Sequence, residues 1–138
     1  MLYENIAKVP ARSLTIFLDA CFSGNSDRGM LLKGVSPALL RVESPILAAS
    51  NAALFAAATN TQVSGWLEAK RHGLFSYWLF RGLQGEADAD TNGTVTVAEL
   101  HDFLKTNVLR MSRKLKNRDQ TPTLASSADS RVLVQWKR

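Results

Sequence analysis

The stretch LTIFLDACFSG, residues 14–24, carries the only cysteine of the chain, Cys21, just after a continuous apolar run. Such a run of strand-forming residues is typical of a β-strand covered on both faces. In open parallel sheets reactive groups gather where strands end, and the small residues Ser23 and Gly24 would leave a thiol accessible there. A cysteine attacks only as the thiolate, so a nucleophilic Cys21 would need a base nearby. A structural cysteine that packs as a small apolar side chain is the competing interpretation.

A second group of residues that could do chemistry is the acidic loop DADTNGTVTVAE, residues 88–99. It fits the calcium-loop pattern at every specified position, with Gly93 where the loop must turn sharply and Val95 as an apolar anchor. Calcium is bound by oxygen atoms. In this loop the side chains of Asp88, Asp90 and Asn92 would supply one oxygen each, and Glu99 would supply both of its carboxylate oxygens. The backbone carbonyl of Thr94 would bind directly, and Thr96 would bind through a water molecule.

The same loop also fits a capped turn that binds no ion. Asn92 and Gly93 favour a tight bend, and Thr96 with Glu99 forms the pattern of a capping box at the start of a helix. Both interpretations use the same side chains, so the sequence leaves calcium as a possible ligand and helix capping as the alternative.

The elements that must position these residues follow from the apolar spacing. Strands are expected over 14–19, 53–58 and 131–136, a short helix over 2–9, and two longer helices over 73–84 and 97–115. Strands that alternate with helices favour an α/β fold with a mainly parallel sheet and helices on both faces. The helix over 73–84 should bury the apolar residues Leu74, Phe75, Trp78, Leu79 and Leu83. The helix over 97–115 should bury the apolar residues Val97, Leu100, Leu104, Val108, Met111 and Leu115.

Composition limits the classes of function. The 138 residues suit one domain, and no apolar run approaches the roughly 20 residues of a membrane span. The N-terminus lacks the pattern of a secretory signal, and one cysteine cannot form an internal disulfide, so a cytoplasmic location is expected. The net charge is +5, but the one dense basic run, 110–118, is typical of a solvated helix end. We therefore expect neither a nucleic-acid nor a membrane partner.

Five segments of the sequence together resemble one known family. The segment DACFSG is followed in order by ALFAAATNTQVSGW, KRHGLFSYWLFRGLQGEAD, TVTVAELHDFL and QTPTL. This series, from about residue 2 to residue 136, resembles the caspase-like cysteine peptidases, in particular the bacterial metacaspase and orthocaspase branch. The resemblance implies a three-layer α/β/α sandwich.

The resemblance also assigns roles to two residues. It implies that Cys21 is the nucleophile and that its backbone N–H contributes to the oxyanion hole. Asp19 matches the acidic residue that lines the pocket for the side chain before the scissile bond, where a carboxylate favours Arg or Lys. The substrate would then be a polypeptide cut after a basic residue, with no cofactor required for the chemistry. The alternative for Asp19 is a carboxylate at a strand end that caps a nearby amide.

The base of the implied catalytic pair is not evident in the sequence. In this family the histidine lies about 50 residues before the cysteine, whereas 20 residues precede Cys21 and none is a histidine. His72 stands at a helix start and His101 on the polar side of the long helix, so we expect neither to replace it.

We therefore expect residues 1–138 to form a single, N-terminally truncated caspase-like domain with an EF-hand-like loop at 88–99. Its partner would be the missing N-terminal segment that carries the histidine, and the isolated chain would have little or no peptidase activity. Loop-borne basic residues at 28, 33 and 41 could serve as a processing site. The alternative from another class is a non-catalytic calcium-binding or protein-interaction module on the same scaffold.

Overall fold

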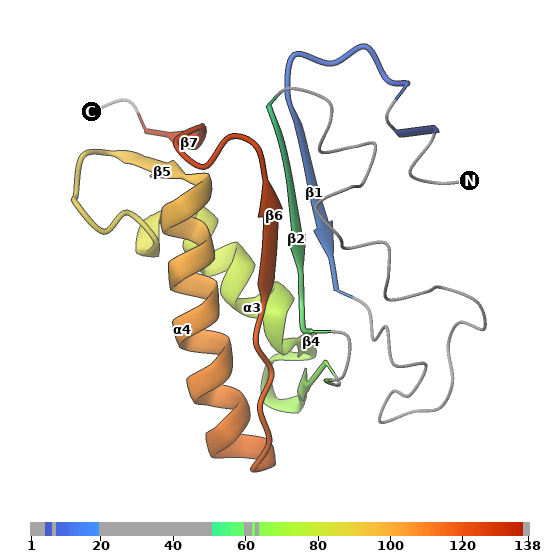
Figure 1. The fold of residues 1–138 in the computed structure, drawn as a ribbon. Coiled ribbons are helices and arrows are strands. Elements are labelled where there is room, and N and C mark those ends of the chain that lie inside the picture. Colours follow the sequence, from blue (N-terminus) through green and yellow to red (C-terminus); the bar gives the residue numbers. More distant parts are fainter. Residues whose placement is uncertain (1–4, 7, 20–50, 60–61, 63, 137–138) are drawn as a thin grey trace.

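The computed structural model describes residues 5–136 except 7, 20–50, 60, 61 and 63 (Figure 1). The described residues form a mixed α/β structure with a three-stranded sheet, two small two-stranded sheets and two long helices. The α/β class expected from the alternating pattern is therefore confirmed in this coarse form. Among the helices of the described ranges, none combines the length and the apolar character needed to cross a membrane.

The main sheet has the strand order β1-β2-β6, with β2 in the centre. Strands β1 (Leu14–Leu18) and β2 (Ala52–Ala56) are parallel, whereas β6 (Thr123–Ser126) runs antiparallel to β2. In this part of the chain the sheet is thus mixed rather than mainly parallel. The rings of Phe17 and Phe55, which are register partners, stack with centroids 5.1 Å apart.

Strand β2 is buried on both faces, as its apolar sequence predicts. Its residues Ala53 and Phe55 point to the face on which the helices pack and belong to the hydrophobic core. The intervening residue Leu54 points to the opposite face and is also buried. Strand β1 is only half-buried along its length.

Helices α3 (Leu74–Arg81) and α4 (Val97–Lys116) lie side by side on one face of the sheet (Figure 1). They bury the expected apolar residues with three exceptions, one of which is Met111, partly buried against the core. Leu83 is only partly buried in the π-helical turn Gly82–Glu86 that follows α3, and Leu115 is 48% exposed. The expectation that Leu115 is buried was wrong because the last turn of α4 runs past the end of the sheet (Figure 1).

The C-terminal strand corrects a second expectation. Strand β7 (Val132–Gln135) forms as predicted, but it pairs antiparallel with β5 (Thr94–Thr96) instead of joining the main sheet. The third strand of the main sheet is β6, which begins at the end of the QTPTL segment (120–124) and was not expected to be a strand. A short hairpin of β3 (Trp66–Leu67) and β4 (His72–Gly73), with the 3-10 turn Glu68–Lys70 at its tip, precedes α3.

Candidate functional site

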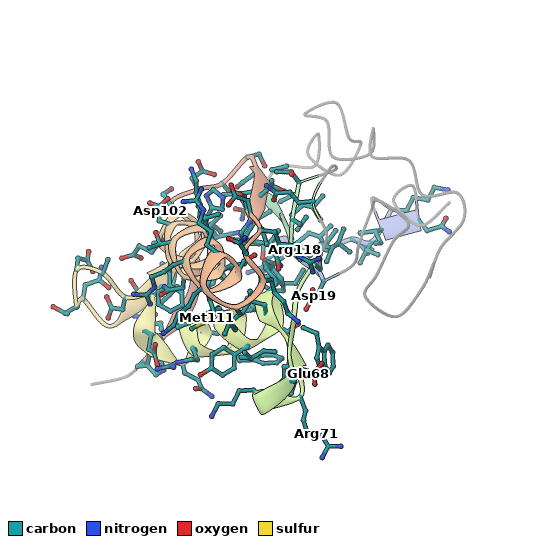
Figure 2. All side chains as sticks on the ribbon, turned by 90° about the horizontal axis from the view of Figure 1, so that it is seen from below. Asp19, Glu68, Arg71, Asp102, Met111 and Arg118 are labelled. Atoms are coloured by element: carbon teal, nitrogen blue, oxygen red, sulfur yellow. The ribbon has the colours of Figure 1, made fainter. Side chains whose placement is uncertain are left out.

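The carboxyl ends of β1 and β2 lie at the same edge of the sheet because the two strands are parallel. Their pairing continues to the strand ends, where the Ala57 N–H donates to the carbonyl of Leu18 at 2.9 Å. Asp19 follows directly and is exposed at this edge, which faces the viewer in Figure 2. Cys21, the predicted nucleophile, lies outside the described residues, as does the predicted processing segment.

The carboxylate of Asp19 reaches the first turn of α3. Its Oδ2 accepts hydrogen bonds from the hydroxyl of Ser76 at 2.6 Å and from the backbone N–H of Ser76 at 3.3 Å. The residue at the N-cap position of α3 is Gly73, which has no side chain to accept from that N–H. The structure therefore contains the helix-capping contact named as the alternative role of Asp19. Its role in a substrate pocket stays a prediction.

The β3–β4 hairpin lies beside this carboxylate. Trp66 pairs with Gly73, and paired residues of an antiparallel hairpin project to the same side. A β-carbon built at Gly73 would point at Asp19, so this face of the hairpin is the one that faces Asp19. Trp66, which is 42% exposed, therefore projects from the same face. His72 projects to the opposite side, where its ring meets the edge of Phe80 at 6.2 Å. Because Cys21 lies outside the described residues, the expectation that His72 is not the missing base stays a prediction.

A buried glutamine that the sequence did not single out ties the hairpin to β2. Gln120 is fully buried; its Oε1 accepts from the Gly65 N–H at 2.7 Å and its Nε2 donates to the Ala57 carbonyl at 2.9 Å. Next to it, the Thr121 N–H donates to Oε1 of Gln62 at 2.7 Å. One side chain thus fixes both the end of β2 and the start of the hairpin that borders Asp19. No local pattern in the sequence marks Gln120 for this role.

The acidic loop brings together three of its predicted ligands. One carboxylate oxygen from each of Asp88, Asp90 and Glu99 lies within 4.8 Å of the other two. The chain turns here through positive φ angles at Thr91 and Gly93, the latter at the position where the pattern requires a glycine.

The same side chains also bond to the backbone of the loop. Asp88 accepts from the N–H groups of Asn92 and Gly93, and the side-chain oxygen Oδ1 of Asn92 accepts from the N–H and the hydroxyl of Thr94. Glu99 accepts from the N–H of Thr96 at 2.9 Å and from its hydroxyl at 2.8 Å, and its own N–H donates back to that hydroxyl. The capping box expected at the start of α4 is therefore present.

The loop is braced by the C-terminal strand, a contact that the sequence did not predict. Val95, at the centre of β5, is fully buried and pairs with Val134 of β7. The Trp136 N–H donates to the carbonyl of Gly93 at 2.9 Å. The second half of the loop is thus one strand of a small antiparallel sheet.

The basic run at 110–118 ends α4, and most of its cations are exposed, as expected for a solvated helix end. Arg113 forms a two-pronged ion pair with Asp119, at 2.6 and 3.1 Å. The hydrogen bond from Arg113 lowers the pKa of Asp119 below its ordinary value. At the end of α3, the Nε–H of Arg81 donates to Oε1 of Glu86 at 2.6 Å, and this hydrogen bond raises the pKa of Arg81.

Comparison with models of protein families, with curated proteins and with solved structures finds no match to this chain. Any functional conclusion therefore rests on the motifs and on the geometry described above.

Proposed function

We propose that this chain is part of a caspase-like cysteine endopeptidase that cleaves polypeptides after Arg or Lys. The observation that carries the proposal is the position of Asp19. Its carboxylate is exposed at the sheet edge where two parallel strands end, and Cys21 follows two residues later in the sequence. An exposed carboxylate beside a nucleophile would pair with a basic side chain and repel an acidic one.

The arrangement of the main sheet supports this proposal. Two parallel strands, an antiparallel edge strand and two helices on one face are compatible with part of a three-layer α/β/α sandwich. Among the described residues β1 has one neighbour, β2, and its side chains are half-buried. A further strand could pair along its other edge, and we assign the missing histidine to such a segment.

The reaction proposed for the intact enzyme uses the Cys21 thiol, the histidine of the further segment and the Asp19 carboxylate. The Cys21 thiolate attacks the carbonyl carbon of the peptide bond, and the C–N bond breaks as the histidine delivers a proton to the leaving amine. A water molecule, deprotonated by the same histidine, then attacks the thioester carbon, and the C–S bond breaks to release the acid and regenerate the Cys21 thiolate. Asp19 takes no part in bond making; it holds the basic side chain that precedes the scissile bond.

Affinity labelling of the single thiol tests the specificity without requiring turnover. We expect a peptidyl arginine chloromethyl ketone to alkylate Cys21 about tenfold faster than its citrulline analogue, which has the same shape but no charge. Asp19→Asn should bring the two rates together, and Glu68→Asn, at an exposed acidic residue of the hairpin turn, should not. Equal rates in the wild-type chain would overturn the proposal.

Turnover provides the second part of the test. The chain alone should release almost no fluorophore from an Arg-containing peptide, because the proposed base lies outside it. Robust cleavage that Cys21→Ala abolishes would contradict the assignment of the base to another segment.

The second candidate function, a calcium-binding module, is favoured by the acidic loop. Three carboxylates converge there, and the hydrogen bonds that they accept within the described residues come from backbone N–H groups, the Asn92 amide and the Thr96 hydroxyl, all of them uncharged. The pairing of β5 with β7 gives this loop a neighbouring strand, which would limit the loss of conformational freedom on binding.

Calorimetry with calcium chloride tests this candidate. We expect a single saturable site that Glu99→Gln weakens at least about tenfold, because Glu99 would supply two of the ligand oxygens. Glu68→Gln changes the net charge equally at a distant exposed residue and should leave the affinity unchanged. The absence of saturable heat at millimolar calcium would reject a calcium-binding role, whereas binding with no thiol selectivity would favour the module over the peptidase.

A further inference from the structure

The first turn of α3 has an unusual source for its N-terminal cap. An α-helix begins with backbone N–H groups that lack partners within the helix, and the N-cap side chain normally satisfies the one at the third position. In α3 the N-cap is Gly73 and the third position is Ser76. The acceptor for the Ser76 N–H is Asp19, 57 residues away in the sequence.

Gly73 leaves the space that the carboxylate occupies. A β-carbon at Gly73 would collide with Oδ2 of Asp19 and would lie 3.1 Å from its Cγ. The Oδ2 atom of Asp19 ends a short side chain, not a long and flexible one. It can therefore move away from a β-carbon at position 73 only if the Asp19 side chain rotates. Any residue other than glycine at position 73 would therefore displace the carboxylate from the first turn of α3.

The hydrogen bonds also distinguish the two oxygens of Asp19. Within the described residues both bonds from Ser76 end on Oδ2, and the shorter one, from the hydroxyl, is 2.6 Å long. The terminal torsion of an aspartate is broad, so an unrestrained carboxylate would rotate over a wide range. The hydroxyl of Ser76 fixes that torsion and leaves Oδ1 as the oxygen available to a cation.

We infer that Ser76 is a positioning residue and Gly73 a specificity-determining residue for the recognition of a basic side chain by Asp19. This inference rests on the proposed peptidase function, because it concerns the same specificity pocket. Neither residue contacts the reacting atoms. Their effect is to hold the Asp19 carboxylate in one orientation against the helix while it binds a guanidinium or ammonium group.

The test compares the arginine and citrulline labels on variants of Ser76. Ser76→Ala should lower the arginine-to-citrulline ratio of Cys21 labelling rates by about threefold, since one hydrogen bond to the carboxylate is lost. Ser76→Thr keeps the hydroxyl and should retain the ratio. Gly73→Ala should lower the ratio further than Ser76→Ala, because it displaces the carboxylate itself.

A matched control separates positioning from stability. Ser112 is buried in α4, and its hydroxyl donates to the Arg118 carbonyl, also at 2.6 Å. Ser112→Ala therefore removes a hydroxyl hydrogen bond of the same length from a different helix. It should lower the urea midpoint of unfolding and leave the labelling ratio at the wild-type value.

The possible outcomes separate this inference from the proposed function. A wild-type ratio near one rejects the proposed function, and this inference with it. A wild-type preference for arginine that Ser76→Ala leaves intact overturns the inference alone. A drop in the ratio for Ser76→Ala, with Ser76→Thr and Ser112→Ala at the wild-type value, supports it. Should Gly73→Ala not fold, the Ser76 variants still decide the matter.

Discussion

Replacing Gln120 with leucine would remove two buried hydrogen bonds while nearly preserving the size of the side chain. Gln120 is fully buried and joins the Gly65 N–H to the Ala57 carbonyl, at 2.7 and 2.9 Å. In the leucine variant both backbone groups stay buried and lose their partner. Each such loss costs about 1–3 kcal/mol, so we expect the free energy of unfolding to fall by about 3 kcal/mol. That is a large part of the roughly 5–15 kcal/mol typical of a whole domain.

Urea denaturation followed by tryptophan fluorescence measures this change. With an m-value of about 2 kcal/mol per molar urea, the midpoint should move down by about 1.5 M at an unchanged slope. Gln135→Leu is the matched control, since Gln135 is exposed on β7 and its side chain has no described partner at that edge. It should move the midpoint by less than about 0.3 M, which corresponds to the usual effect of a surface substitution.

A second variant separates the two hydrogen bonds of Gln120. Gln120→Glu keeps an oxygen for the Gly65 N–H but places an acceptor against the Ala57 carbonyl, so we expect it to destabilise at least as much as leucine at neutral pH. If Gln120→Leu shifts the midpoint no more than Gln135→Leu does, these two hydrogen bonds do not hold the hairpin to β2, and our description of the scaffold is wrong.

Two further predictions concern the helices. Because Arg113 depresses the pKa of Asp119, their pair should stabilise the fold at neutral pH and lose that effect as the pH falls below about 4. The difference in urea midpoint between the wild type and Asp119→Asn should therefore shrink from pH 7 to pH 3. A difference that stays constant over this range would contradict the link between the pKa of Asp119 and stability. Leu104→Ala, at a fully buried residue of α4, should lower the free energy of unfolding by about 2–5 kcal/mol. Leu115→Ala, at a residue 48% exposed on the same helix, should lower it by less than about 1 kcal/mol. Similar shifts in melting temperature for the two variants would show that the last turn of α4 is packed.

The elements that depend on local pattern were predicted well. The apolar period of α4 and the continuous apolar runs of β1 and β2 place these elements within one or two residues of their observed bounds. Strand β6 was missed because it is only four residues long and directly follows Pro122, and it becomes a strand only by pairing with β2, about 70 residues earlier. Strand β7 was found, but its partner β5 was not, since pairing between distant strands leaves no trace in either segment alone.

The candidate sites follow the same division between local and distant contacts. The acidic loop is contained in twelve consecutive residues, and the sequence predicted its capping box, which is present; its calcium ligand set stays a prediction, although three of the side chains converge. For Asp19 the sequence suggested a capping role but could not name Ser76, which lies 57 residues further along the chain. Gln120 was missed for the same reason, because its two partners precede it by 55 and 63 residues.

The two candidate sites share one physical feature, which bears on how each would bind a cation. Asp19 accepts from Ser76 in the first turn of α3, and Glu99 completes the capping box of α4 by accepting from Thr96. In both cases a single carboxylate oxygen accepts from the hydroxyl and the N–H of one residue. A cation that binds only the other oxygen leaves the cap intact, whereas one that needs both oxygens must weaken it. Loss of a cap costs about 1 kcal/mol, equivalent to about fivefold in affinity. A guanidinium at Asp19 can use Oδ1 alone, but calcium bound through both oxygens of Glu99 must compete with Thr96.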